Sequence, residues 1–583
     1  MPPRTARTAK HRRPPAHTLT RRRALQGAVG GSVGLGGALD SLAAAPPRVP
    51  VQAASHLVRL RVDATATGRP ARPQLLGSNT PWVYGSEGLM DARGQWLPHM
   101  IRRARELAPT LLRYPGVPDT HDWRQGIGPL ASRSPVFAYP GQPHQTIVYG
   151  TQEFLETCET VGAEPMIQLN LHDGDDATLA RLAAAWVTHV NQGTLVSRIT
   201  GRPLPKVRWW ELGNEPYLME ATEADGRPNR LMLTPEAYAQ RVNAVMAAAR
   251  AVDPTLKFGL PFAIDTHSGQ PWRNGGDEMA NVVGPQLGFA RRVLGKLQRP
   301  QDIGWLSLHC YMPQLNDPQD AQGRPLPLPD ARSLFWATVA GSETWRHSLG
   351  RAVRLWRDHA STRHLPAPPI AVTEYNAFYS TRRINGQDAP ENTWVTTLTG
   401  ALYVADLLRM MSELPEVGAA LHWSLNGNWV FGALAATPVG APERERPAAG
   451  ALRLAAQVLR EGRLLDCGVR VATTGAVNKR VGFCAPWPDM PLASAMASRN
   501  GQTLQVLVIH KDPDRDADVS LQLDHAQVRS AQLKTLQADA AFDAPETARA
   551  SRLVQRDWQP AAGGDVTWRM PPGSIALLTL TLA

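Results

Sequence analysis

The sequence predicts an α/β protein: a (β/α)8 TIM barrel followed by a C-terminal antiparallel β-sandwich domain. Eight apolar runs of strand length alternate with eight helical stretches between residues 71 and 461. Beyond residue 462 the long helical stretches stop, and short β-type runs are separated by Gly, Pro and Asp. The 583 residues also exceed the length of one ordinary domain, which favours two or more.

The strands of the predicted barrel are continuous apolar runs, as is typical of parallel strands that are buried on both faces. They lie at 75–79, 110–114, 165–170, 207–213, 257–261, 303–311, 369–374 and 417–424. The predicted helices lie at 97–108, 151–162, 176–191, 234–252, 285–298, 344–360, 392–414 and 448–460. Such an alternation closes into a parallel barrel with its helices outside, here residues 71–461.

The predicted sandwich comprises residues 462–583, with strands at 503–510, 518–523, 529–536 and 574–582. The segment 57–62 alternates apolar and polar residues, so residues 46–70 are expected to add an N-terminal strand to this sandwich. Residues 312–343, rich in Pro, Asp and Gln, are expected to form a long irregular insertion after the sixth barrel strand.

The formal net charge of +11 is concentrated at the N-terminus. Residues 1–45 hold eight basic residues and one acid, so they carry +7 and leave +4 on the rest of the chain. Nothing in that remainder has the pattern of a basic stripe, so we expect no nucleic-acid partner.

The basic leader contains Thr20-Arg21-Arg22-Arg23-Ala24-Leu25-Gln26, which resembles a twin-arginine signal. A weakly apolar, glycine-rich stretch and the small residues Ala43-Ala44-Ala45 follow it. The resemblance implies a signal peptide over residues 1–45, the twin-arginine export machinery as a partner, and a periplasmic or secreted protein. A disordered basic leader and an uncleaved membrane anchor are the alternatives.

The four cysteines predict no metal site, because no Cys/His spacing is that of a zinc centre. Cys158 and Cys310 fall in predicted elements and are expected to be buried thiols. Cys467 and Cys484 flank a turn-rich segment and could pair in an oxidising compartment.

Two glutamates end apolar strands: Glu215 in Trp209–Pro216 and Glu374 in Pro369–Asn376. They close the fourth and seventh predicted barrel strands, so both are expected at the carboxyl-end face of the barrel, where such barrels carry their chemistry. Two carboxyl groups facing each other are what hydrolysis of a glycosidic bond needs, one as proton donor and one as nucleophile or base.

Asn214-Glu215-Pro216 after one strand, with Glu374 on a later one, resembles the clan A retaining glycoside hydrolases, which are built on (β/α)8 barrels. Further motifs narrow this resemblance to the α-L-arabinofuranosidases of glycoside hydrolase family 51 and extend it over roughly residues 57–583. In chain order they are Leu112–Gly116, Asp122–Pro129, Glu153–Cys158, Gly162–Pro165, Ala251–Pro254, Ser307–Tyr311 and Pro571–Ser574.

The resemblance implies a role for each site residue. Glu215 would be the acid/base, Glu374 the nucleophile, and Asn214 would bind the sugar 2-hydroxyl. Trp423, at the end of the eighth strand, resembles the clan's aromatic platform under the sugar. No cofactor is implied.

Four further residues are candidates for substrate or nucleophile contacts from their places at strand ends. Arg113 would hydrogen-bond the nucleophile, with a surface Arg as the alternative. His309 and Tyr311 alternate on the sixth strand, so both could point into the barrel mouth, Tyr311 towards Glu374 and His309 towards substrate; a core His is the alternative. Asn170, with His172 beyond it, ends the third strand and is a candidate sugar contact.

Three departures from the family pattern concern the terminal sugar. Gly116-Val117-Pro118 stands where Gly-Gly-Asn is usual, and the first strand ends at Asn79 without a sugar-binding glutamate. The seventh strand continues Tyr375-Asn376-Ala377-Phe378 instead of Trp-Asn with a later Trp. An endo-β-glycanase or β-xylosidase-like hydrolase is therefore an alternative to an α-L-arabinofuranosidase-like enzyme, and a non-catalytic carbohydrate-binding protein is a third. The oligomeric state is left open.

Overall fold

The computed structural model describes residues 55–82, 88–116, 121–136, 144–218, 229, 231–263, 286, 288–315, 329–360, 365–380, 383–384, 387–388, 390–427, 430–435, 445–539, 551–560 and 565–583. The predicted export signal lies outside these residues, as do Val117 and Pro118.

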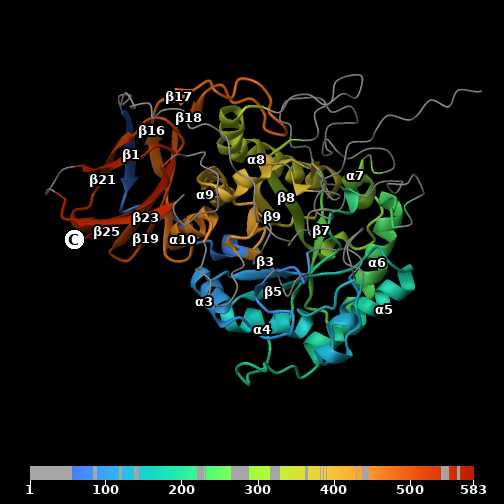
Figure 1. The fold of residues 1–583 in the computed structure, drawn as a ribbon. Coiled ribbons are helices and arrows are strands. Elements are labelled where there is room, and N and C mark those ends of the chain that lie inside the picture. The colour runs from blue at the N-terminus through green and yellow to red at the C-terminus, as the bar shows by residue number, and fades with distance from the viewer. Residues whose placement is uncertain are drawn as a thin grey trace, which may run out of the picture.

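Eight parallel strands close into a barrel, in the order β12-β3-β4-β5-β6-β7-β8-β9 (Figure 1). Every predicted barrel strand is present. Their bounds are β3 (Gly77–Asn79), β4 (Leu111–Tyr114), β5 (Glu164–Gln168), β6 (Trp209–Glu211), β7 (Lys257–Pro261), β8 (Ile303–Leu315), β9 (Ile370–Ser380) and β12 (Val417–His422). The (β/α)8 fold class is therefore confirmed.

Helices surround the barrel at the predicted places. They are α3 (Pro98–Leu107), α4 (Thr151–Val161), α5 (Asp176–Val187), α6 (Pro235–Val252), α7 (Phe289–Leu294), α8 (Ala331–Ala360), α9 (Leu398–Glu413) and α10 (Pro447–Leu459). In the part of the chain that the structure describes, no helix combines the length and the apolar character that a membrane crossing requires.

The prediction of an irregular insertion at 312–343 is wrong for most of the residues in this range that the structure describes. Strand β8 continues to Leu315, and α8 begins at Ala331. Asp330 caps this helix, because its Oδ1 accepts the backbone N–H of Ser333 at 2.9 Å. Leu334 and Phe335 then bury their side chains in the core. The Pro- and Asp-rich composition concealed this helical start.

The lower part of the barrel interior is filled, not open. Leu111, Met166, Trp305, Ala371 and Leu421, from five strands, form an interior cluster that is distinct from the core under the helices. Gly259 on β7 gives Trp305 its space: a Cβ there would lie 2.1 Å from the indole ring. This packed floor leaves the opposite, carboxyl-end mouth of the barrel for a site.

The C-terminal domain is built on two large sheets, of strand order β16-β1-β21-β24 and β2-β15-β19-β20-β25-β22-β23 (Figure 1), and also holds the short pair β17 (Thr473–Thr474) and β18 (Met490–Pro491). The first contains β16 (Cys467–Arg470), β1 (His56–Asp63), β21 (Ala517–Asp524) and β24 (Val566–Met570). The second contains β2 (Arg69–Pro70), β15 (Arg463–Leu465), β19 (Ala493–Asn500), β20 (Thr503–His510), β25 (Ser574–Leu582), β22 (Val528–Gln537) and β23 (Arg552–Trp558). The division into domains by residue number stays a prediction.

One pair of sandwich strands departs from the antiparallel expectation. β1 lies between β16 and β21, antiparallel to the first and parallel to the second. The whole barrel separates β1 from these strands in the sequence, so no short hairpin connection constrains its direction.

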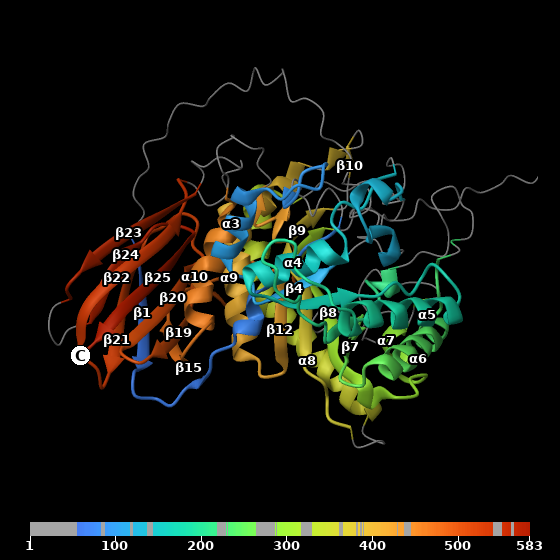
Figure 2. The same ribbon diagram turned by 90° about the horizontal axis from the view of Figure 1, so that it is seen from below.

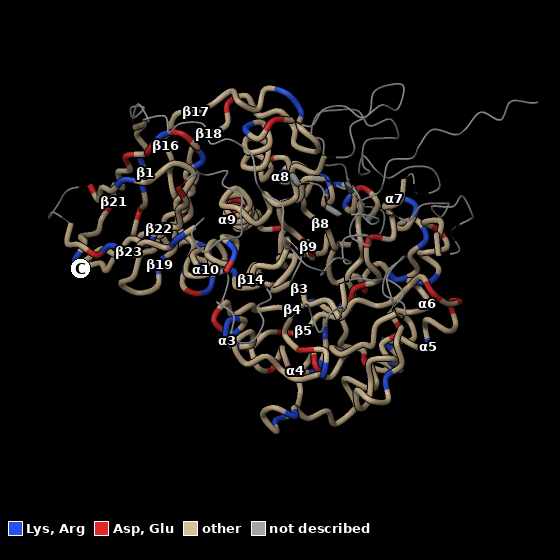
Figure 3. The backbone as a smooth tube through the Cα atoms, viewed as in Figure 1, with Lys and Arg blue, Asp and Glu red and all other residues tan. Residues whose placement is uncertain are grey.

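Helices α9 and α10 lie between the barrel strands and the sandwich (Figures 1 and 2). Leu507 and Ile509 of β20 and Leu577 of β25 belong to the same buried cluster as the barrel core. The two domains therefore share a continuous apolar core. Acidic and basic residues are interspersed along both domains (Figure 3).

All four cysteines are free thiols, so the suggested pairing of Cys467 with Cys484 is not formed. Cys467 lies on β16 opposite Val62, whereas Cys484 is buried and its Sγ donates to the carbonyl of Ala485. Burial raises the pKa of both thiols to about 12.

Candidate active site

Strand ends β4, β6, β8 and β9 bring six of the predicted site residues together in the barrel mouth. They are Arg113, Asn214, Glu215, His309, Tyr311 and Glu374, and each is buried. Hydrogen bonds and ion pairs join these six residues into a single cluster.

The chain turns sharply where it leaves β6 to place Glu215. Gly213 has φ +90°, which glycine adopts readily because it has no Cβ, and Glu215 itself has φ +44°. A left-handed backbone at a residue other than glycine costs about 1–3 kcal/mol and is concentrated at functional sites. The turn aims Glu215 Oε1 at His309 Nδ1, 2.7 Å away.

A β-bulge places the second glutamate. Ala371 points into the interior floor cluster, so strict alternation would turn Glu374, three residues later, out of the barrel. Instead, Val372 pairs with Leu308, and Glu374 pairs with the next residue, His309, so β9 carries one extra residue. The pairing of β9 with β12 shifts at the same point. The bulge returns Glu374 to the interior.

Glu374 lies between a cation and a phenol. Arg113 Nη1 donates to its Oε1 at 3.1 Å, and the Tyr311 hydroxyl donates to its Oε2 at 2.7 Å. His309 Nδ1 lies 3.4 Å from the same Oε2. Both Arg113 and Tyr311 thus take the places that the sequence predicted for them, next to the candidate nucleophile.

The two candidate catalytic carboxylates are close neighbours. One carboxylate oxygen of Glu215, one of Glu374 and a ring nitrogen of His309 all lie within 4.8 Å of one another. These three residues could also ligate a metal ion, although the sequence predicts none. Glu215 Oε1 is hydrogen-bonded to His309 Nδ1, and Glu374 accepts from Arg113 and Tyr311.

Arg113 connects four strand ends. Its Nε donates to Glu211 at 2.5 Å, Nη1 donates to Asn79 at 3.1 Å as well as to Glu374, and Nη2 donates to Asn214 at 2.7 Å. The guanidinium is fully buried; burial lowers its pKa, but the charges of Glu211 and Glu374 outweigh that effect and raise the pKa above its usual value. Arg113 is therefore a permanent cation at the centre of the site.

The remaining predicted residues lie at the edge of this cluster. Trp423 is 4% exposed and packs over Gly116, whose added Cβ would lie 2.6 Å from the indole and 3.3 Å from Arg113 Nη1. Asn170 is half-buried, and its Oδ1 accepts the backbone N–H groups of His172 and Asp173 at 2.9 and 3.2 Å. The Asn170 side chain oxygen is thus already engaged in a turn.

Two residues of the site were missed from the sequence. Glu211, 1% exposed, pairs with Arg113, and Asn79 donates from Nδ2 to the carbonyls of Thr373 and His422 at 2.9 and 3.2 Å. The signal for Glu211 was its place two residues after Trp209, on the same inward side of β6. Asn79 offered only its position as the last residue of β3.

Residues 103–267 match the family model of the alpha-L-arabinofuranosidase 1 domain. The chain is similar to α-L-arabinofuranosidases. It is 34% identical over 190 residues to a probable alpha-L-arabinofuranosidase C of Aspergillus niger, which covers 30% of this chain and 34% of that protein. It is 33% identical over 175 residues to the alpha-L-arabinofuranosidase C of Emericella nidulans, over 28% and 31% of the two chains. The chain thus spans about a third of the length of the curated relatives it matches.

The arabinofuranosidase-like fold extends much further than the sequence match. The family 51 α-L-arabinofuranosidase of Thermotoga petrophila superposes with a TM-score of 0.67 at 20% identity, over 90% of this chain and 99% of that one. CelM2, a bifunctional glucanase-xylanase from a metagenome library, superposes with a TM-score of 0.53 at 15% identity, over 90% and 99%. The resemblance to family 51 drawn from the motifs is confirmed.

Proposed function

We propose that this protein is a retaining, α-L-arabinofuranosidase-like glycoside hydrolase. The observation that carries the proposal is the separation of the two carboxylates, which have oxygens within 4.8 Å of each other. Retaining enzymes hold their carboxyl groups about 5–5.5 Å apart, whereas inverting enzymes leave about 6.5–9.5 Å for a water molecule. The sequence match over residues 103–267 supports the arabinofuranosidase-like assignment.

In the first step, a Glu374 oxygen attacks the anomeric carbon and forms a glycosyl ester as the glycosidic C–O bond breaks. Glu215 gives its proton to the departing oxygen. Arg113 and Tyr311, each bonded to a different Glu374 oxygen, hold the nucleophile in one orientation. Asn214 is held next to it by Arg113 and is placed to bind the sugar 2-hydroxyl.

In the second step, the roles of acid and base are exchanged. Glu215, now a carboxylate, takes a proton from water, whose oxygen attacks the anomeric carbon and releases Glu374 as a carboxylate. The hydrogen bond between Glu215 and His309 orients the acid/base for both steps. The two inversions together retain the configuration of the sugar.

The second candidate is an endo-β-glycanase or β-xylosidase-like hydrolase that uses the same pair. One observation favours it: the end of β3 presents Asn79 to the site, and the Asn79 amide is consumed by Arg113 and two backbone carbonyls. No carboxylate stands at that position to hold a terminal sugar.

The deciding experiment is a panel of aryl glycosides and polysaccharides, tested with the protein starting at Pro46 and with Glu374→Ala. Release from an aryl α-L-arabinofuranoside, abolished in a folded Glu374→Ala variant, is the expected result. Cleavage of a β-linked glycan alone would favour the second candidate. A protein that binds glycans without turnover, and that a fluoroglycoside does not label at Glu374, would be the non-catalytic carbohydrate-binding alternative.

We also propose export through the twin-arginine pathway, supported by Arg21-Arg22-Arg23 and the stretch that follows. Replacement of Arg21 and Arg22 by Lys should leave the protein in the cytoplasmic fraction of its producer. Unchanged release would contradict this route.

A further inference from the structure

The carboxylate of Glu211 is buried in the floor of the site and plays no part in the two-step reaction above. Its side chain is 1% exposed, and its ion pair among the described residues is with Arg113, at 2.5 Å. Arg113 itself is completely buried and also pairs with Glu374 at 3.1 Å. One guanidinium therefore serves two carboxylates, through Nε for Glu211 and through Nη1 for Glu374.

The reaction changes the charge on only one of these two carboxylates. Glu374 is an anion before attack and a neutral ester in the covalent intermediate. Without a second carboxylate, Arg113 would then be a buried cation with no counter-ion, which is strongly unfavourable in a protein interior. With Glu211 in place, Arg113 remains paired throughout the cycle.

We propose that Glu211 is a positioning residue that acts through Arg113: it is the permanent counter-ion that lets Glu374 give up its charge to the sugar. This inference rests on the proposed function. Glu211 also prevents Arg113 from forming an exclusive ion pair with Glu374, which would make that carboxylate a weaker nucleophile. It thus favours formation of the glycosyl ester and stabilises the ester once formed.

Glu211→Gln tests the inference, because it removes the charge and keeps an oxygen that can accept from Arg113 Nε. We expect kcat/KM to fall by roughly 100-fold even for activated aryl glycosides, since ester formation itself is slowed. The burst of aryl alcohol should shrink, because the ester no longer accumulates. The acidic limb of the kcat/KM profile should move to lower pH, since Arg113 now stabilises the ionised nucleophile alone. The other groups facing Glu374 are Tyr311, His309 and Glu215.

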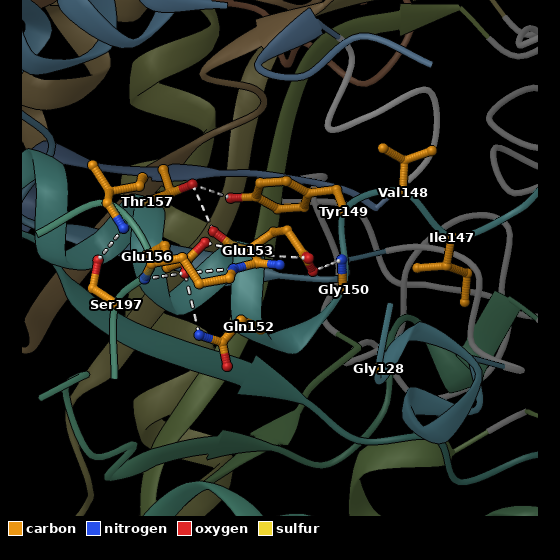
Figure 4. A network of polar contacts seen from close by, with 12 residues as sticks. Gly128, Ile147, Val148, Tyr149, Gly150, Gln152, Glu153, Glu156, Thr157 and Ser197 are labelled. Atoms are coloured by element: carbon orange, nitrogen blue, oxygen red, sulfur yellow. Dashed lines mark hydrogen bonds and ion pairs between the residues drawn. The ribbon is translucent and has the colours of Figure 1, made fainter. Parts of the chain in front are cut away.

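Glu153→Gln is the matched control. Glu153 on α4 is also a buried glutamate, and it accepts from Arg133 and Arg198 at 2.9 and 2.8 Å. It also accepts from the backbone N–H of Gly150 at 2.9 Å (Figure 4). The substitution removes the charge of a buried carboxylate that pairs with two arginines, on a helix outside the barrel strands. We expect lower thermal stability with kcat/KM within about twofold of wild type and an unshifted pH profile.

A thermodynamic cycle gives a second readout that needs no turnover. In Glu374→Gln, which mimics the uncharged nucleophile, Glu211→Gln leaves Arg113 without any counter-ion. Glu211→Gln should then lower the free energy of unfolding more in the Glu374→Gln background than in the wild-type protein. Additive effects of the two substitutions would contradict the inference. If Glu211→Gln does not fold, Glu211→Asp replaces it in the kinetics: because Asp keeps the charge, the burst and the pH profile should stay close to those of wild type, and loss of the burst would overturn the proposal.

The two levels of proposal fail in distinguishable ways. If the wild-type protein cleaves no glycoside and is not labelled at Glu374, the proposed function itself is wrong. If it is active and labelled but Glu211→Gln behaves like Glu153→Gln, only the role of Glu211 is wrong.

Discussion

Glu215 and Glu374 are the same side chain, and the groups around them make them different. Glu374 accepts from a guanidinium and a phenol, so it is suited to attack as an anion. Glu215 Oε1 faces the imidazole of His309, whose Nδ1 lies 2.7 Å away. This difference in surroundings supports the proposed roles, Glu215 as proton donor and Glu374 as nucleophile.

The loss of activity on removing the proposed proton donor should therefore depend on the substrate. Glu215→Ala should lose far more activity on substrates with poor leaving groups than on activated aryl glycosides, which need little protonation; general acid catalysis contributes about 100- to 10,000-fold. The measurement is kcat/KM across a series of aryl leaving groups. Equal loss at both ends of the series would contradict the assignment of Glu215 as the acid.

The sequence identified the partners of these carboxylates better than it identified the framework around them. Arg113 and Tyr311 were predicted beside Glu374 because each sits at a strand end in the barrel mouth. Glu211 and Asn79 act through hydrogen bonds across the barrel, to residues 98 and 34 positions away in the chain. Such partners are set by the closure of the barrel, which no local pattern encodes.

At the scale of elements, two irregularities in the strands make the site. The bulge in β9 turns Glu374 inward, and Gly259 on β7 admits the large Trp305 ring into the barrel floor. Trp305 packs with Leu111 and Leu421 from β4 and β12. The floor thereby keeps the strands that carry Arg113 and His309 at a fixed separation.

Gly259→Ala should disturb this floor. The new methyl group would lie 2.1–2.4 Å from three atoms of the Trp305 ring, so we expect a loss of about 3 kcal/mol in the free energy of unfolding. Denaturant unfolding measures it. Gly468→Ala on β16, where the nearest atoms lie 3.7 Å from an added Cβ, is the control and should change stability little. Similar values for the two variants would contradict the role given to Gly259.

At the scale of the whole molecule, a buried charge network joins the barrel to the sandwich. Asp406 on α9 accepts from Lys511 Nζ at 2.8 Å, from Arg409 Nε at 2.6 Å, and from the hydroxyls of Ser342 and Ser494 at 2.5 and 2.6 Å. Burial raises the pKa of Asp406, but the charges of Arg409 and Lys511 prevail and hold it well below the ordinary 3.8.

Asp406→Asn should destabilise the protein by about 3–5 kcal/mol, because it leaves Lys511 and Arg409 buried without their shared anion. The matched control is Asp514→Asn, which breaks a half-exposed pair with Arg332 that also links barrel and sandwich; about 1 kcal/mol or less is expected. Since the folded pKa of Asp406 is depressed, its contribution is full above pH 3.8 and is lost as the pH falls further. The difference in free energy of unfolding between wild type and Asp406→Asn should therefore shrink below pH 3.8; a constant difference would contradict this.

The sequence by itself determined the barrel, its eight strands and the identity of both glutamates, because these depend on local apolar periodicity and on what ends each strand. Only the tertiary structure decided the rest. The inward turn of Glu374 needed a bulge defined by its neighbouring strands, and α8 began where composition suggested a loop. The parallel pairing of β1, the free Cys467 and Cys484, and the Glu211–Arg113 pair all join segments far apart in the chain. Their distances are set when the barrel closes and the sandwich docks on it, so they are properties of packing and not of any single stretch of sequence.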